Sequence, residues 1–326
     1  MQKVLVTGGA GFIGSNLTHR LASQKIAVDV VDNLLTGAAH NLPEGLPWHQ
    51  FDCSDSAFVT AFSNKNSDKN SGHNSGHNYD AIVHLAGASS APLFDAEPNH
   101  MHGAVSAFQN SLEIARRCDA KVAFASTSSF YARCEKPYKE SMHVTPATLY
   151  ECSKLSMEHL GQSYAATYGL DVSALRFFSV YGPREQGKGR FANIVSQFLW
   201  AMRAGEQPTI YGDGSQTRDF TYVGDLLDGL MLTLQHTKGF EAYNIGTGVE
   251  HTFNDVVRML NEALGTDIEP RYIANPVRNY VQETLADSSK LQALGWKPRV
   301  NFREGIAKIV ALDDPISATL LAKIRV

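Results

Sequence analysis

Short runs rich in apolar residues alternate with helically spaced segments through the first half of the chain. The runs cover 4–6, 27–31, 81–85, 122–125 and 172–178. Apolar residues recur at helical spacing over 12–22, 104–117 and 150–168. Apolar runs separated by helices are typical of parallel strands buried on both faces. We therefore predict an α/β fold of Rossmann type, with a doubly wound parallel sheet.

The texture of the sequence changes near residue 180. Glycine, proline and polar turns become frequent, and further helices are expected over 190–204, 254–264 and 287–295. This pattern predicts a smaller α+β domain. We expect the first domain to span 1–175 with 215–247 returning to it, and the second to span 176–214 and 248–326.

One segment, 63–78, reads SNKNSDKNSGHNSGHN. Because it has no apolar side chains to bury, we predict a flexible surface loop. His73 and His77 have a spacing that could recruit a metal on a helix, but Gly76 and the surrounding Asn and Ser residues disfavour a helix. A surface loop that binds no metal is the favoured interpretation, and no metal site is predicted.

Composition narrows the function classes. The chain has 326 residues, 43% hydrophobic and 19% charged, with a formal net charge of −4. It is long enough for a large core, and it lacks the cationic excess of a nucleic-acid binder or a polybasic membrane patch. The four cysteines form no CxxC pair and are expected to be reduced thiols. No apolar stretch is as long as a membrane span, and no signal peptide is evident, so we expect a cytoplasmic protein.

A glycine-rich turn joins the first apolar run to the first helix. The sequence TGGAGFIG places Gly8, Gly11 and Gly14 at the end of a strand and the start of a helix. Such a turn lets the backbone approach a pyrophosphate, and the helix N-terminus favours an anion. The turn therefore predicts a dinucleotide site.

Two acidic residues are candidates for contacts with the adenosine part of the dinucleotide. Asp32 ends the second apolar run, and Asp52 ends the short run that comes next. Asp32 lies 18 residues after Gly14, where an acid accepts hydrogen bonds from the adenosine ribose. A carboxylate there would repel a 2′-phosphate, so NAD is expected rather than NADP. Asp52 is placed to meet the adenine amino group, and the alternative for Asp52 is an ordinary helix N-cap.

A tyrosine and a lysine share one face of a predicted helix. Tyr150 and Lys154 are four residues apart. A free tyrosine has a pKa near 10, so a tyrosine base needs a nearby cation that favours the phenolate. Upstream, 126–129 reads STSS directly after an apolar run, where hydroxyls face the ligand crevice of such a sheet. Together these residues point to an oxidoreductase site.

With these pieces in order, the chain resembles the extended short-chain dehydrogenase/reductases, within the NAD-dependent nucleotide-sugar epimerase/dehydratase family. The resemblance covers the whole chain except the 63–78 segment. The matching motifs are TGGAGFIG (7–14), VDNL (31–34), HLAG (84–87), STSSFYA (126–132), YECSK (150–154), LRFFSVYGPRE (175–185), IYGDGSQTRDFTYV (210–223) and NIGTG (244–248).

The resemblance implies roles for the matching residues. Tyr150 would be the general base and acid on the sugar 4-hydroxyl, Lys154 would bind the nicotinamide ribose, and Thr127 would bond the same sugar oxygen. The first domain would bind NAD and the second a nucleotide sugar. Besides Tyr150 and Lys154, the implied cofactor-binding residues are Gly8, Gly11, Phe12, Ile13, Gly14, Asp32, Asn33, Asp52, Cys53, Leu85, Ala86, Gly87 and Phe177.

The family also implies substrate contacts. Arg218 matches an arginine on the sugar nucleotide's diphosphate, and Arg278 is expected to be a second cation, although its register is one residue shorter than the family pattern. The remaining implied substrate-binding residues are Thr127, Ser128, Phe178, Ser179 and Thr284. A small residue at the position of Thr284 is associated with acceptance of N-acetylhexosamines, so we expect a pocket that takes N-acetylglucosamine as well as glucose.

Departures from the family pattern bear on the reaction. Dehydratases resemble Thr-Asp-Glu at 127–129, and decarboxylases usually carry glutamate at the position of Ser129, so the hydroxyls here favour epimerisation. Ser179 and Ala104 stand where the family usually has asparagine, and Ala132 stands where it usually has glycine.

These observations predict an NAD-dependent 4-epimerase of a UDP-hexose. Hydride would leave C4 while Tyr150 takes the 4-OH proton, and it would return to the opposite face of a 4-keto intermediate. The alternatives are another nucleotide-sugar reaction (4-epimerisation of a UDP-hexuronate, dehydration, decarboxylation or reduction) and a non-catalytic NAD sensor. A homodimer is expected through the helices before STSS and around Tyr150. Its apolar stripe would be Phe108, Leu112, Leu155, Leu160 and Tyr164, which could instead pack inward on the sheet.

Overall fold

The computed structural model describes residues 1–63, 78–276 and 280–312. Three features expected from the sequence fall outside these ranges: nearly all of the 63–78 segment, its histidines His73 and His77, and Arg278.

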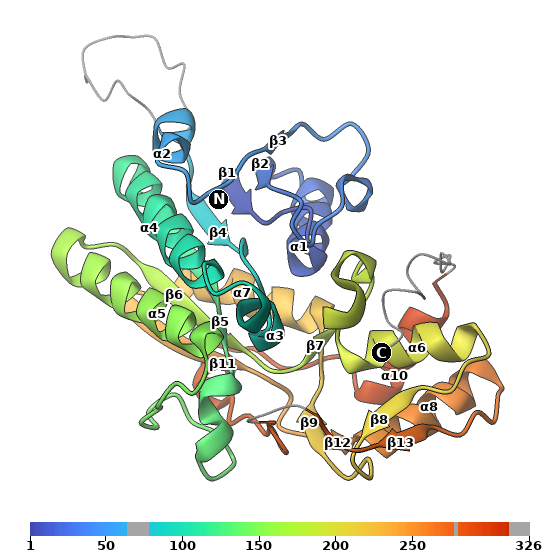
Figure 1. Ribbon diagram of the computed structural model, residues 1–326. Helices are drawn as coiled ribbons and strands as arrows, with labels where there is room; N and C mark the ends of the chain where they lie inside the picture. Colours follow the sequence, from blue (N-terminus) through green and yellow to red (C-terminus); the bar gives the residue numbers. More distant parts are fainter. Residues whose placement is uncertain (64–77, 277–279, 313–326) are drawn as a thin grey trace, which may run out of the picture. The chain divides into compact units, whose positions relative to one another are not determined.

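A seven-stranded sheet forms the centre of the fold, in the order β11-β6-β5-β4-β1-β2-β3 (Figure 1). β1 pairs in parallel with β2 and β4, and β4 pairs in parallel with β5. The strand order reverses beside β1, which is where doubly wound sheets bind ligands. The predicted Rossmann-type fold is therefore confirmed. The strands are β1 Lys3–Thr7, β2 Ala27–Asp32, β3 Trp48–Gln50, β4 Ala81–His84, β5 Lys121–Thr127, β6 Val172–Phe177 and β11 Phe240–Ile245.

The chain divides into two compact units. Unit 1 comprises 1–126, 148–175 and 230–243, and unit 2 comprises 127–147, 176–229 and 244–326. Residues 127–147, 215–229 and 244–247 thus group with unit 2, whereas the sequence predicts the first domain for all three segments. The helices of unit 1 are α1 Phe12–Ser23, α2 Ala57–Phe62, α3 Ala91–Ala96, α4 His100–Cys118 and α5 Leu149–Tyr168, and α7 Val223–His236 runs from unit 2 into unit 1.

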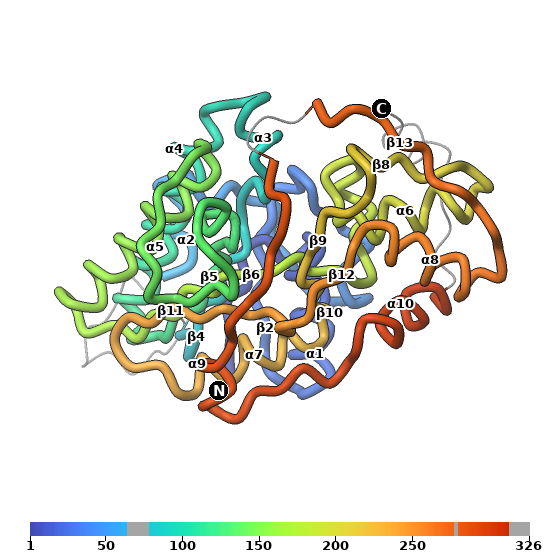
Figure 2. The backbone as a smooth tube through the Cα atoms, turned by 90° about the horizontal axis from the view of Figure 1, so that it is seen from below, coloured from blue at the N-terminus to red at the C-terminus, as the bar shows by residue number. Residues whose placement is uncertain are grey.

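The core of unit 1 lies between the sheet and its helices. α4 and α5 run side by side over the strands (Figures 1 and 2). Leu5 and Phe124 from the strands meet Phe108 and Leu112 from α4, with the rings of Phe108 and Phe124 4.3 Å apart. Phe108 and Leu112 are fully buried, so these two residues of the expected dimer stripe pack inward. The homodimer stays a prediction.

Unit 2 is built from short elements around a second apolar cluster. Its strands form three two-stranded pairs, β10 with β7, β12 with β9 and β13 with β8. Two of its helices begin with a capping box, in which the N-cap side chain and the side chain three residues later each accept a backbone N–H. The pairs are Thr252 with Asp255 and Asn301 with Glu304. Its remaining elements are β7 Val180–Tyr181, α6 Ile194–Arg203, β8 Thr209–Tyr211, β9 Thr217–Asp219, β10 Thr221–Tyr222, β12 Glu250–Thr252, α8 Phe253–Leu264, β13 Arg271–Ile273, α9 Ser289–Gln292 and α10 Phe302–Val310.

Several expected boundaries are wrong. The helix expected to begin at 190 begins at Ile194, because the Asn193 side chain accepts a hydrogen bond from the Val195 N–H and caps it there. The helix expected at 104–117 begins one turn earlier, at His100. The helix expected at 287–295 is only the single turn of α9.

Across the ranges that the structure describes, the helices are too short or too polar for any of them to cross a membrane.

His84, the last residue of β4, is fully buried. Its Nδ1 lies 2.9 Å from Thr7 Oγ1 and 3.0 Å from Ser111 Oγ. Burial, aided by the charge of Lys154, lowers the pKa of this imidazole to about 3. The ring is therefore a neutral core group in the folded protein.

This buried imidazole predicts a loss of stability in acid. Between pH 6.5 and the folded pKa the unfolded chain binds the extra proton, so stability falls as the pH falls. The unfolding free energy of the wild type minus that of His84→Gln should fall by about 1.4 kcal/mol for each pH unit below 6.5. Urea unfolding of both proteins at pH 7 and pH 5 measures this. An unchanged difference between the two proteins would show that His84 titrates normally.

Candidate active site

Glycine is required at two places, one in the turn between β1 and α1 and one in the first turn of α1. Gly8 has φ 69°, in the left-handed region, and a Cβ there would lie 2.7 Å from the backbone of Leu85 and Ala86. A Cβ on Gly14 would lie 2.1 Å from the Gly8 carbonyl oxygen. The glycines therefore let strand, helix and the following loop approach one another closely.

The start of α1 is open to an anion. Gly11 is the N-cap and has no side chain to cap the helix, and the first turn holds no acidic residue. A helix N-terminus of this kind carries backbone N–H donors and positive partial charge. Phe12 and Ile13, which the family resemblance assigns to the cofactor, are not among the residues that line the adjacent cavity.

A cavity of about 200 Å³, open to solvent, lies beside this turn in unit 1. The turn between β1 and α1, the ends of β2 and β4, the loop after β3 and the start of α4 all contribute to it. The lining includes the expected residues Gly8, Gly11, Asp32, Asn33, Asp52, Cys53, Leu85, Ala86 and Gly87.

The acidic side of this cavity is ordered by short hydrogen bonds. Asp32 accepts from the backbone N–H of Ala10 at 2.9 Å and of Leu34 at 2.7 Å. Burial raises the pKa of this carboxyl, and the backbone hydrogen bonds partly oppose that shift. The carboxylate is therefore fixed at the end of β2, at the place where the sequence predicts a ribose contact.

Asp52 is not a helix cap, because α2 has Ser56 as its N-cap. Its carboxylate accepts from Ser54 N–H and from Asn33 Nδ2. Partial burial raises the pKa of Asp52, but the hydrogen bonds from Ser54 and Asn33 outweigh it and the net shift is downward. Beside it, burial raises the pKa of the Cys53 thiol, which therefore stays protonated.

The sequence pattern does not predict the wall of the cavity that the start of α4 forms. Asn99 and His100 line it, together with Gly103, Ala104 and Ala107 from the same end of α4. The helix starts earlier than its apolar spacing suggested, so its first turn was not recognised. The small residues at 103, 104 and 107 were the available signal, because they leave space on one helix face.

Tyr150 and Lys154 lie one turn apart near the start of α5. The Thr148 side chain caps this helix by accepting from Glu151 N–H. Lys154 Nζ donates to the Ala125 carbonyl at 2.9 Å and lies 5.9 Å from the centre of the Tyr150 ring. Burial lowers the pKa of Lys154 to about 8. At neutral pH the lysine is therefore still mostly an ammonium, held to β5 beside the tyrosine.

Aromatic packing fixes the tyrosine ring. Phe94 in α3 meets the Tyr150 ring edge-on at 5.5 Å, and the His100 ring also packs against Phe94 at 5.9 Å. Tyr150 is 8% exposed. α3, the start of α4 and α5 therefore hold this ring together within unit 1.

Hydroxyl residues follow at the end of β5. Thr127, its last residue, donates from Oγ1 to Ser129 Oγ at 3.0 Å and accepts from Ser129 N–H. Ser128 is 8% exposed. Neither an acidic side chain nor an amide is present in 127–129, so this turn offers only hydroxyl groups.

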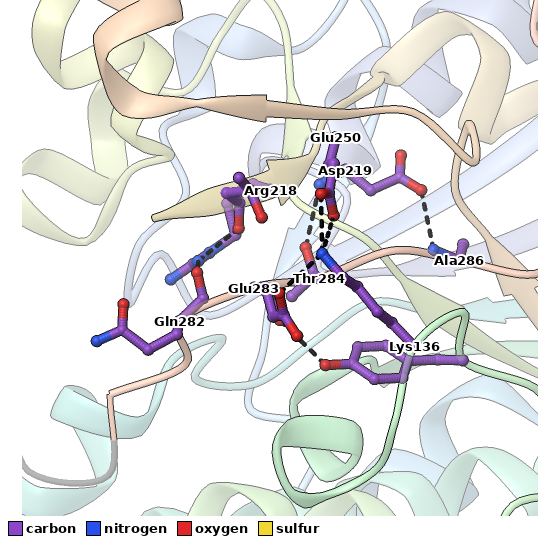
Figure 3. A network of polar contacts seen from close by, with 10 residues as sticks. Lys136, Arg218, Asp219, Glu250, Gln282, Glu283, Thr284 and Ala286 are labelled. Atoms are coloured by element: carbon purple, nitrogen blue, oxygen red, sulfur yellow. Dashed lines mark hydrogen bonds and ion pairs between the residues drawn. The ribbon is translucent and has the colours of Figure 1, made fainter. Parts of the chain in front are cut away.

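In unit 2, Arg218 lies in β9. Its guanidinium donates to the carbonyl of Gln282 (Figure 3) and to that of Thr217. It also stacks on the rings of Phe253 and Tyr280, each 5.4 Å away. Burial lowers the pKa of this guanidinium, although arginine stays charged at physiological pH. The Arg218 side chain is therefore a cation whose position is fixed by hydrogen bonds and ring stacking.

The other substrate residues expected in unit 2 differ in exposure. Phe178 is fully buried against Tyr131 and Tyr138, so only its backbone could meet a ligand. Ser179 is partly exposed and has φ 33°, an unusual conformation for a residue other than glycine. Thr284 is 4% exposed and its hydroxyl accepts from Asp219 N–H at 3.1 Å. Phe177, the last residue of β6, is partly exposed.

Comparison with known proteins decides the family. A family model described as the NAD dependent epimerase/dehydratase family matches residues 4–246. The chain belongs to this family. The glycine turn without room for a Cβ, the open helix N-terminus and the fixed Asp32 carboxylate fit its cofactor, NAD, in the cavity of unit 1.

Relatives within the family differ in reaction. A UDP-glucose 4-epimerase from Mycolicibacterium smegmatis is 32% identical over 317 residues, covering 94% of this chain and 97% of its own. A UDP-glucuronic acid decarboxylase 1 from Xenopus tropicalis is 31% identical, covering 95% and 71%. The crystal structure of a Thermotoga maritima UDP-glucose 4-epimerase with UDP-glucose has a TM-score of 0.86 at 32% identity, covering 95% and 97%.

The Asp32 carboxylate predicts cofactor preference. Asp32→Asn should lower NAD affinity by about 10- to 100-fold, because a charge-assisted hydrogen bond to a ribose hydroxyl is lost. It should also narrow the preference for NAD over NADP, because the carboxylate no longer repels a 2′-phosphate. Fluorescence titration with both cofactors measures this.

Asp29→Asn is the matched control, because Asp29 lies on the same strand but pairs with Lys3 and Tyr79 outside the cavity. It should bind NAD like the wild type. Equal NAD affinities for all three proteins would mean that Asp32 does not contact the ribose.

Proposed function

We propose that the protein is an NAD-dependent nucleotide-sugar 4-epimerase that inverts C4 of a UDP-hexose. The observation that carries this proposal is the buried Lys154 ammonium, 5.9 Å from the Tyr150 ring centre and tied to the β5 backbone. A cation held in this way favours the phenolate of an adjacent tyrosine. Tyr150 is then equipped to move a proton at neutral pH.

The proposed mechanism assigns one task to each residue. Bound NAD supplies the hydride-accepting and hydride-returning chemistry at the sugar C4. Tyr150 takes the proton from the sugar O4 as a ketone forms there, and it gives the proton back when the ketone is reduced. Thr127 donates a hydrogen bond to the same oxygen once its hydroxyl hydrogen turns away from Ser129 Oγ, which accepts it in this structure. Arg218 binds the diphosphate through charge-assisted hydrogen bonds.

The hydroxyls at 127–129 support epimerisation over the other family reactions. Elimination of water from the sugar needs an additional acid and base, and neither Thr127, Ser128 nor Ser129 provides a carboxyl group. The Ser129 hydroxyl is already bonded to Thr127, at the position where decarboxylases carry glutamate. The decarboxylase relative makes loss of carbon dioxide the main competing reaction.

Replacement of the tyrosine tests the mechanism. Tyr150→Phe should lower kcat on the order of 10²- to 10⁴-fold, because the proton-transferring hydroxyl is lost, and NAD should remain bound. Tyr168→Phe is the matched control, since Tyr168 lies on the same helix and is 52% exposed. Proton NMR time courses with UDP-glucose and UDP-glucuronate, without added reductant, follow the C4 epimer directly.

The outcomes separate the candidates. A new anomeric signal without NADH absorbance supports epimerisation, whereas a pentose product from UDP-glucuronate would indicate decarboxylation. Full turnover by Tyr150→Phe would exclude the tyrosine mechanism. No turnover of any nucleotide sugar by the wild type, with NAD bound, would favour a non-catalytic NAD sensor.

Thr284 predicts the range of sugars. A small side chain at this position is expected to leave room for an N-acetyl group, so the wild type should convert UDP-N-acetylglucosamine as well as UDP-glucose. Comparison of kcat/KM for the two substrates measures this, with a ratio within about 100-fold expected, the size of one or two lost apolar contacts. Turnover of UDP-glucose alone would reject the wide pocket.

A further inference from the structure

Lys136 in unit 2 bridges two carboxylates from distant parts of the chain (Figure 3). Its Nζ lies 2.8 Å from both carboxylate oxygens of Glu250 and 2.7 Å from Glu283 Oε2. Glu250 is in β12, whereas Glu283 lies in the extended segment 280–286. Hydrogen bonds to Glu250 and Glu283 raise the pKa of the Lys136 ammonium. The Lys136 side chain is therefore an ammonium throughout the physiological pH range.

The two glutamates belong to the neighbours of β9 on either side. β12 pairs with β9 antiparallel, with Glu250 opposite Asp219 and His251 opposite Arg218. On the other side, segment 280–286 accepts the N–H of Thr217 through the Gln282 carbonyl at 3.0 Å. β9 is thus flanked by two segments, and the Lys136 ammonium ties them to each other.

The side chain of Arg218 depends on one of these segments. Its guanidinium donates to the Gln282 carbonyl at 3.2 Å and stacks on the Tyr280 ring. Both partners belong to segment 280–286. A displacement of this segment from β9 would therefore remove two of the contacts that orient Arg218.

The backbone next to Lys136 also contacts this segment. Tyr138 donates from its N–H to the Leu285 carbonyl at 2.8 Å and from its hydroxyl to the Glu283 carbonyl at 3.1 Å. The ion pair of Lys136 with Glu283 therefore adds to the two hydrogen bonds that Tyr138 makes with the same segment. Single exposed ion pairs contribute little to stability, so the effect of this bridge is expected in geometry more than in folding.

We propose that Lys136 is a positioning residue, whose bridge between Glu250 and Glu283 holds segment 280–286 against β9 and so orients Arg218 toward an anionic diphosphate. This inference rests on the proposed function only in the assignment of Arg218 to the diphosphate. The competing reading is that Lys136 binds the ligand directly.

The test is calorimetric titration of UDP into the NAD-loaded full-length protein. Lys136→Met and Glu283→Gln should each weaken UDP binding roughly 5- to 20-fold, because both break the bridge, with NAD affinity unchanged. Lys136→Arg should restore binding to within about twofold, since it keeps the charge. The control is Lys139→Met, which removes a more exposed cation from the same loop, 3.7 Å from Asp287.

Hydrogen exchange of the free protein provides a readout that does not depend on ligand. Lys136→Met should speed the exchange of the Thr217 and Asp219 amides, which donate to segment 280–286. Unchanged exchange would overturn the proposal. Tighter UDP binding by Glu283→Gln would overturn it as well, because freeing Lys136 would then help a direct contact.

The two failures are distinguishable. If the wild type does not bind UDP but the Thr217 and Asp219 amides exchange faster in Lys136→Met, the bridge holds β9 and the proposed function fails. If the wild type binds UDP and Lys136→Met binds it equally, the positioning role fails and the proposed function stands.

Discussion

The close approach of backbone segments at Gly8 is the constraint on which the site in unit 1 depends. A Cβ there would lie 2.7 Å from the backbone of Leu85 and Ala86, so the loops after β1 and β4 can meet only because the residue is glycine. Gly14 repeats the requirement from the helix side. These contacts bring the bare N-terminus of α1 to the cavity edge and leave space for a pyrophosphate against the backbone.

The buried ammonium of Lys154 is the second feature on which the proposed chemistry depends. Lys154 stays beside Tyr150 because its ammonium donates to the Ala125 carbonyl, while Phe94 packs edge-on against the tyrosine ring. Burial makes that ammonium costly, as its lowered pKa shows, and the carbonyl bond compensates part of the cost. The fold therefore maintains a cation beside the tyrosine that we propose as the base, which a solvated surface pair could not do as effectively.

Local patterns predicted much of this, and long-range contacts account for the rest. The central strands, the glycine turn and the Tyr150–Lys154 pair follow from spacing within a few residues, and Asp32 follows from its position 18 residues after Gly14. The burial of Phe178 against Tyr131 and Tyr138 was not predictable, because the three rings meet from separate segments. The Lys136 bridge is hidden for the same reason, since more than a hundred positions separate Lys136 from each of its partners.

The central claim is that a proton moves through Tyr150 while the hydrogen on C4 leaves and returns without exchanging with solvent. The most direct measurement uses UDP-glucose carrying deuterium at C4, incubated in ordinary water without added NAD. The account predicts UDP-galactose that retains the deuterium at C4, as detected by mass spectrometry and NMR. Product in which solvent hydrogen has replaced the deuterium would contradict it.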